Sequence, residues 1–294
     1  MGDSGGIPLS VVVPVREGLA EVADLIEAML PDAAAVGAEV VVVGDLDEGE
    51  SAPDERVLLV PVASRDILEL HRRGIEAARG EVIAMGEDHA WPRPEWWEAV
   101  IRAHAANPEV PAIVGGLVNA TDSTLAGRAN FLAFAAPWQP PLPLLPARRP
   151  PPCSALSFKR WALEPAARER AGWLEAELIP ATFGAGEMLV DDRIVVDHYQ
   201  DHGVIWSIRN AFHSARSSYG YERERLPSRQ RRRVARWVLE NIPSRQRQEA
   251  REGSPGRTLP LGERALIAVL GYAHALGAVA GVLGGPGSSP DRLA

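Results

Sequence analysis

The N-terminal part of the chain alternates short apolar runs with segments of helical periodicity. Continuous apolar runs rich in β-branched residues are typical of strands buried on both faces of a sheet. The chain has four of them: Leu9 to Val15, Ala38 to Val43, Val57 to Val62 and Val82 to Met85. Apolar residues recur at helical spacing from Leu19 to Leu30 and from Ile67 to Ala78. This alternation predicts βαβ units and a mainly parallel α/β sheet flanked by helices.

The rhythm continues with a helix predicted over Trp96 to Ala106 and a strand over Ala112 to Val118. It is interrupted at residues 137–152, where eight prolines predict a loop. Further elements are predicted beyond the loop: strands over Ala155 to Phe158 and Met188 to Val196, and helices over Leu174 to Thr182 and Ile205 to Tyr219.

Polar side chains directly follow three of the predicted strands. They are Arg16 and Glu17 after the first strand, Asp45 and Asp47 after the second, and Glu87 to His89 after the fourth. In an open parallel sheet, ligands bind at the carboxyl ends of the strands. One acidic loop is more often simply solvated, but three such loops at neighbouring strand ends favour a ligand site.

The segment Glu87 to His89 offers two carboxylates and an imidazole within three residues. Oxygen and nitrogen ligands of this kind suit Mn²⁺ or Mg²⁺, with a diphosphate completing the coordination shell. His198, which follows a later strand, is a candidate for a further ligand, and a surface histidine is the alternative interpretation. We therefore expect Glu87, His89 and His198 to hold a metal ion.

Two glutamates, Glu175 and Glu177, lie near the start of the helix predicted over Leu174 to Thr182. A carboxylate placed beside a bound acceptor can act as a general base that removes a proton from a hydroxyl group. The alternative is that both charges only complement the dipole at the helix N-terminus. The local sequence leaves both interpretations open.

Composition narrows the class of protein. The net charge of −8 and the pI of about 5.5 argue against a nucleic-acid partner. Residues 222–251 nevertheless carry ten arginines and four glutamates, and such local basicity suits an anionic lipid surface. A single cysteine excludes an internal disulfide and no signal peptide is visible, so we expect a cytoplasmic location.

The C-terminal part has a different character. Ala265 to Leu283 is apolar, carries no formal charge and has about the length of a membrane span. We expect residues 1–221 to form one α/β domain and residues 222–294 to form a basic, then apolar helical region. This region would hold the protein peripherally on the inner face of the cell membrane, and the alternative is a helical appendage packed on the first domain. Oligomeric state stays open.

Several motifs follow one another in a defined order. They are Leu9-Ser-Val-Val-Val-Pro-Val15, Glu39-Val-Val-Val-Val-Gly-Asp45, Arg73-Gly-Ile-Glu-Ala-Ala-Arg-Gly-Glu-Val-Ile-Ala84, Glu87-Asp-His89, Pro92-x-Pro94 and Trp96. In this order and at these spacings the chain resembles, over Leu9 to Tyr219, the family-2 inverting glycosyltransferases. The resemblance implies a GT-A fold and a metal-dependent transfer of a sugar from a UDP- or GDP-sugar to an acceptor hydroxyl. A lipid-linked or cell-envelope glycan is a candidate acceptor.

The resemblance also implies roles for single residues. Pro14 and Val15 would pass close to the base and ribose, Asp45 would accept a hydrogen bond from the base, and Arg72 would lie near the diphosphate. Glu17, Glu87 and Asp88 complete the expected nucleotide-sugar-binding set.

Two further positions match functional sites of the family. Glu87 to His89 occupies the Asp-x-Asp metal site, with His89 in place of the usual final Asp. Glu175 falls where the family places its catalytic carboxylate, and Glu177 is the second choice, because the usual Glu-Asp pair is missing here.

Three other classes compete with a glycosyltransferase. A non-catalytic transferase-like subunit that binds a nucleotide or a partner fits the change to His89 and the missing Glu-Asp pair. A dinucleotide-binding oxidoreductase is disfavoured because no G-x-G-x-x-G follows the first strand. A nucleotidyltransferase would need a Gly-rich, basic loop there, and Arg16-Glu17-Gly18 offers little of that.

Overall fold

The computed structural model describes residues 6–47, 49–142, 152–163, 188–200, 202–224, 226–254 and 256–293. The chain forms two compact units, one made of Met1–Val118 and Pro140–Asp197 and the other of Asn119–Gln139 and His198–Ala294. The domain boundary expected between residues 221 and 222 stays a prediction. The helix predicted over Leu174 to Thr182 lies outside the described residues, as do residues 143–151 of the proline-rich loop.

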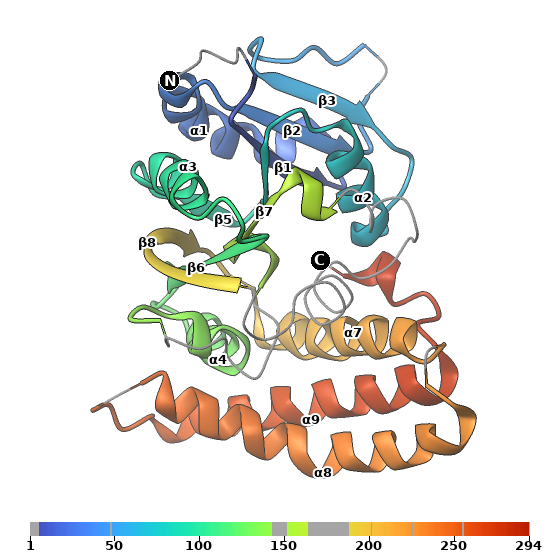
Figure 1. The fold of residues 1–294 in the computed structure, drawn as a ribbon. Coiled ribbons are helices and arrows are strands. Elements are labelled where there is room, and N and C mark those ends of the chain that lie inside the picture. The colour runs from blue at the N-terminus through green and yellow to red at the C-terminus, as the bar shows by residue number, and fades with distance from the viewer. Residues whose placement is uncertain are drawn as a thin grey trace. The chain divides into compact units, whose positions relative to one another are not determined.

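The sheet belongs to the first unit (Figure 1). Its strands are β1 (Leu9–Val15), β2 (Glu39–Gly44), β3 (Val57–Pro61), β4 (Val82–Met85), β5 (Ala90–Pro92), β6 (Ala112–Asn119), β7 (Leu156–Lys159) and β8 (Met188–His198). They lie in the order β3-β2-β1-β4-β7-β6-β8-β5. The first four are parallel, as the alternation predicts, whereas β7 runs antiparallel to both β4 and β6.

The central strands are buried on both faces, which explains their unbroken apolar sequences. All seven residues of β1 and all six of β2 are buried. At their carboxyl ends the two strands approach so closely that a Cβ atom on Gly44 would lie 1.9 Å from the carbonyl oxygen of Val15. Only glycine fits at that position, and Asp45 therefore begins its loop directly beside the end of β1.

Three helices cover this sheet: α1 (Ala23–Val36), α2 (Ile67–Ala77) and α3 (Trp96–Ala106). Figure 1 shows α1 and α3 on one face and α2 on the other. The helix predicted over Leu19 to Leu30 begins as a 3₁₀ turn, Leu19–Val22, and continues through Pro31 to Val36. Proline removes one helical hydrogen bond, but Met29 and Ala33 remain on the buried face on either side of it.

The second unit is helical. Its helices are α4 (Leu125–Phe134), α7 (Val204–Glu222), α8 (Ser228–Glu252) and α9 (Leu261–Gly284). The apolar residues of α9 pack with those of α4 and α7 in a buried cluster that includes Leu132, Ala211 and Leu270. The sequence predicts α7 from its periodicity and α9 from its uncharged apolar run, but it misses α4, a short helix that is buried nearly all round.

Two buried histidines make the stability of the first unit depend on pH. Burial lowers the pKa of His71 to about 4, and burial beside Lys159 lowers that of His104 to about 3. An unfolded histidine has a pKa of about 6.5, so below that pH the unfolded chain binds protons that the folded chain does not. The free energy of unfolding should therefore fall as the pH drops from about 6.5 to about 4, by up to about 1.4 kcal/mol per pH unit for each histidine.

Urea denaturation between about pH 7 and pH 5 measures this slope. His104 lies 2.9 Å from Ser157 Oγ through Nε2, and glutamine can replace that contact. In the variant His104→Gln, the free energy of unfolding should change less steeply with pH, by the amount that corresponds to the uptake of one proton. An unchanged slope would show that His104 titrates alike in both states.

Candidate active site

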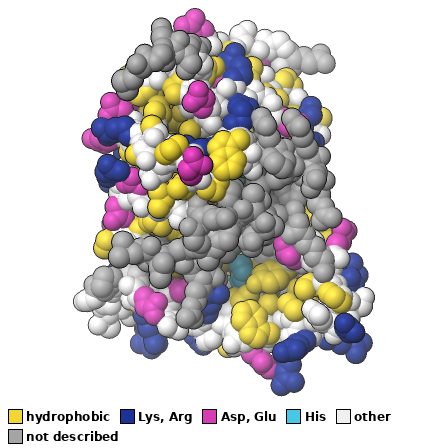
Figure 2. All heavy atoms as spheres, in the orientation of Figure 1, with side chains coloured by type: hydrophobic (Ala, Val, Ile, Leu, Met, Phe, Trp, Pro, Cys, Tyr) yellow, Lys and Arg dark blue, Asp and Glu magenta, His cyan; other side chains and the backbone are white. Residues whose placement is uncertain are grey.

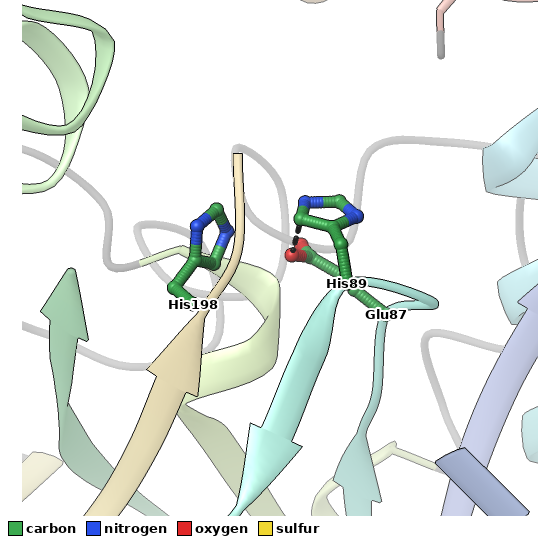
Figure 3. Close-up of side chains that lie close together, drawn as sticks. All are labelled: Glu87, His89 and His198. Atoms are coloured by element: carbon green, nitrogen blue, oxygen red, sulfur yellow. Dashed lines mark ion pairs between the residues drawn. The ribbon is translucent and has the colours of Figure 1, made fainter. Parts of the chain in front are cut away.

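The candidate site is built on a tight turn that joins β4 to β5. The turn begins after Gly86, whose N–H donates to the carbonyl oxygen of Val12 at 2.7 Å. It closes where the N–H of Ala90 donates to the carbonyl oxygen of Glu87 at 3.2 Å. The turn places the side chains of Glu87 and His89 together, with His89 Nε2 3.4 Å from Glu87 Oε2 (Figure 3).

His198, the last residue of β8, completes this group. Strands β5 and β8 are neighbours in the sheet. Just after β5, the N–H of Arg93 donates to the carbonyl oxygen of Val195 in β8 at 3.3 Å, which holds β8 beside the turn from Glu87 to Ala90. An ion pair of 2.7 Å between Arg93 and Asp197 joins the same two segments. The ligand atoms of Glu87, His89 and His198 consequently all lie within 4.8 Å of one another.

Asp88 acts on His89 rather than joining the ligand set. Its Oδ1 lies 2.5 Å from His89 Nδ1, a contact that favours a proton on Nδ1 and leaves Nε2 to face Glu87. Burial alone would lower the pKa of His89, but the bond to Asp88 and the charge of Glu87 outweigh it and raise that pKa. Burial likewise would raise the pKa of Asp88, yet the bond to His89 lowers it overall.

This arrangement fits a divalent cation. Two imidazole nitrogens and one carboxylate oxygen are ligands that Mn²⁺ and related ions accept. Their atoms lie within 4.8 Å of one another, and a small movement of these side chains would bring all three to about 2.1 Å from a shared ion. A carboxylate that fixes the other nitrogen of a ligating histidine is a common support of metal sites. Asp88 is placed to do this for His89.

The expected nucleotide-binding residues lie at the neighbouring strand ends. Pro14 and Val15 are the last residues of β1 and pair with Val43 and Gly44 of β2. Asp45, which follows, is exposed. Because β2, β1 and β4 are consecutive in the sheet, the loops that start at Asp45, after Val15 and at Glu87 emerge side by side.

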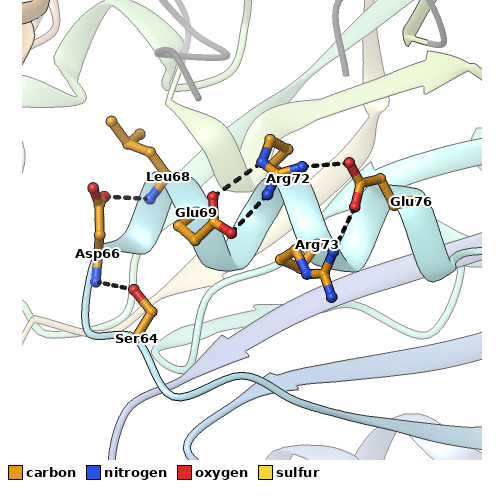
Figure 4. Close-up of polar contacts among 7 residues, drawn as sticks. All are labelled: Ser64, Asp66, Leu68, Glu69, Arg72, Arg73 and Glu76. Atoms are coloured by element: carbon orange, nitrogen blue, oxygen red, sulfur yellow. Dashed lines mark hydrogen bonds and ion pairs between the residues drawn. The ribbon is translucent and has the colours of Figure 1, made fainter. Parts of the chain in front are cut away.

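Two of the expected residues take part in surface ion pairs. Glu17 is exposed and lies 3.5 Å from Arg65. Arg72, on α2, contacts Glu69 Oε1 at 2.6 Å and also pairs with Glu76 (Figure 4). A diphosphate near Arg72 would have to compete with both carboxylates, and the predicted role of this arginine stays a prediction.

The expected catalytic carboxylates, Glu175 and Glu177, lie outside the described residues. Among those described, the structure adds one pair that the sequence does not single out, and it gives a neighbour to Arg16, which directly follows the first predicted strand. The Arg93–Asp197 pair positions β8 against β5; the two residues are far apart in the chain and no spacing rule links them. Arg16 lies near Asp88, and burial lowers its pKa although Asp88 and Glu21 oppose that shift.

The fold is the GT-A fold of glycosyltransferases, as in the mannosyltransferase PcManGT from Pyrobaculum calidifontis in complex with GDP-Man and Mn²⁺. The TM-score is 0.50 and the sequence identity 17%, over 96% of this chain and 76% of that chain. This likeness shows a shared fold.

Weaker likenesses connect the chain to a mycobacterial protein and to mannosyl-3-phosphoglycerate synthase from Rubrobacter xylanophilus. The TM-score is 0.43 for both, with 16% and 14% identity. The first comparison covers 68% of this chain and 70% of that chain, and the second 67% and 68%. No family model matches the sequence, and no curated protein matches it either.

Proposed function

We propose that this protein is a metal-dependent, inverting glycosyltransferase of the family-2 type, which moves a sugar from a nucleotide-sugar to an acceptor hydroxyl. The observation that carries the proposal is the convergence of Glu87, His89 and His198 at the end of β4. In a GT-A sheet this is the edge where the carboxyl ends of the parallel strands open towards a ligand.

The metal ion proposed for this site is Mn²⁺ or Mg²⁺. Glu87, His89 and His198 would hold it, with Asp88 fixing the ring of His89. When bound, such an ion neutralises the negative charge that develops on a departing nucleoside diphosphate.

The other residues are proposed to bind the donor and move a proton. Asp45 would accept a hydrogen bond from the base, while the end of β1 would pass the ribose. Glu175 would take the proton from the acceptor hydroxyl while the oxygen of that hydroxyl forms a bond to the anomeric carbon of the sugar. The bond from that carbon to the diphosphate breaks in the same displacement, so the anomeric configuration inverts.

A ligand screen tests the proposal. A ligand that binds only the folded state raises its stability, by about 2.7 kcal/mol at 100 times its Kd. GDP-mannose is the first donor to try, because PcManGT binds GDP-Man, and UDP-glucose is the comparison. One of these donors should raise the midpoint temperature of thermal unfolding when Mn²⁺ is present. The increase should be much smaller when EDTA replaces the metal.

Turnover then separates the two main classes. Release of GDP or UDP from the stabilising donor, with Mn²⁺ present, identifies an enzyme. Stabilisation without turnover for any acceptor or water would indicate a non-catalytic nucleotide-binding subunit. No Mn²⁺-dependent shift with any nucleotide would refute the proposed site altogether.

A further inference from the structure

Helix α9 is apolar enough to cross a membrane, with a mean hydropathy of 2.0, but 56% of its most apolar window is buried within the protein. Its glycines explain how this packing is achieved. A Cβ atom on Gly277 would lie 2.0 Å from the carbonyl oxygen of Phe212, and one on Gly281 2.5 Å from that of Arg216. The two glycines of this Gly-x-x-x-Gly motif therefore allow α7 to pack closely against α9. The motif serves packing within the protein and not a membrane span.

One face of α9 remains exposed. Val269, Tyr272, Leu276 and Leu283 are each between 45% and 53% exposed, and their spacing of three, four and seven residues places them on one side of the helix. We call these four residues the apolar seam. Val279 lies beside this seam on α9 and packs against the cluster that contains Val238 and Ile242 of α8. The seam therefore runs along the edge where α9 meets α8.

Helix α8 borders this seam and is strongly basic. It contains eight arginines and three glutamates in a chain whose net charge is −8. Arg229, Arg232 and Arg236 are exposed and share one face by their spacing. We call these three residues the arginine stripe. Arg236 also pairs with Glu240 at 2.8 Å, a contact that an anionic headgroup would replace.

The arginine stripe leads towards α9. Its spacing continues through Leu239, which is 44% exposed, to Pro243. The Cα atom of Pro243 would lie 3.1 Å from a Cβ atom on Gly271 of α9. Figure 2 shows basic side chains, which are all arginines in these helices, beside hydrophobic ones.

We propose that the apolar seam and the arginine stripe form a docking surface for an anionic lipid bilayer, on which α8 and α9 lie flat. The seam would enter the boundary between headgroups and acyl chains, as the apolar face of an interfacial helix does. The arginines would contact anionic headgroups. This inference is independent of the proposed enzymatic function.

Charge favours a membrane over a second copy of the chain. A symmetric dimer brings the same surface patch of both subunits together. Such a dimer would bring the arginine stripes of both copies into one interface, and like charges gathered there oppose association. An anionic bilayer instead complements both the charge of α8 and the apolar character of α9.

Flotation of the full chain with lipid vesicles tests the proposal. The protein should float with vesicles of phosphatidylcholine and phosphatidylglycerol at low salt, and far less with phosphatidylcholine alone or at high salt. The triple variant Arg229→Gln, Arg232→Gln, Arg236→Gln should lower the partition coefficient roughly 100-fold, which corresponds to about 1 kcal/mol per arginine. Leu276→Gln with Leu283→Gln should also weaken binding.

Matched controls remove the same chemistry elsewhere. Arg73→Gln, Arg102→Gln and Arg193→Gln delete three exposed arginines of the first unit, and Leu189→Gln with Ile205→Gln replaces exposed apolar residues outside α9. Both controls should float like the unmodified protein. Failure to float with anionic vesicles would overturn the proposal. So would a dimer, seen by light scattering, that the Leu276→Gln, Leu283→Gln variant dissociates.

Discussion

His89→Ala is expected to abolish the effect of Mn²⁺ on nucleotide binding. The substitution removes one of the three groups whose ligand atoms lie within 4.8 Å of one another, and it leaves Asp88 without the ring that it holds. His198→Ala should have the same effect, because it removes a different ligand of the same set. Asp88→Asn should weaken metal binding by about 10- to 100-fold, the usual cost of losing such a supporting group.

Isothermal titration calorimetry measures these effects. MnCl₂ is titrated into each variant to give the Kd of the metal, and GDP or UDP is titrated with and without Mn²⁺ to give the Kd of the nucleotide. His213→Ala is the matched control, because this histidine bonds to Ser289 and lies outside the ligand set. If His89→Ala keeps its full Mn²⁺ dependence, the metal assignment is wrong.

Glu175→Gln is expected to lower turnover by at least about 100-fold, the usual scale for the loss of a general base. Glutamine keeps the shape of the side chain but cannot take a proton, so donor affinity should be retained. The measurement is kcat for sugar transfer, together with the Kd of the donor from the same preparation.

Glu177→Gln is the matched control for this experiment, since it removes the same charge two residues away. It should change kcat little. If Glu177→Gln loses turnover and Glu175→Gln does not, the catalytic carboxylate is Glu177. If neither variant loses turnover, the base lies elsewhere in the chain.

Much of the sheet could be predicted from the sequence because its signals are local. The runs that form β1, β2 and β4 are continuous and β-branched, which only a strand buried on both faces explains well. The turn Glu87–His89 follows β4 directly, so its position at the carboxyl edge of the sheet was also predictable. The antiparallel β7 was not, because the direction in which a strand pairs is set by partners far away in the chain.

Local patterns and the family resemblance therefore predict the GT-A class of the fold, the position of the candidate metal-binding turn and the apolar and basic character of the C-terminal region. The structure adds that Asp88 supports His89 and that β8, which pairs with β5 through Arg93 and Asp197, brings His198 to Glu87. It also shows that Gly277 and Gly281 pack on α7. These outcomes depend on contacts between residues distant in sequence, which local patterns of polarity do not encode.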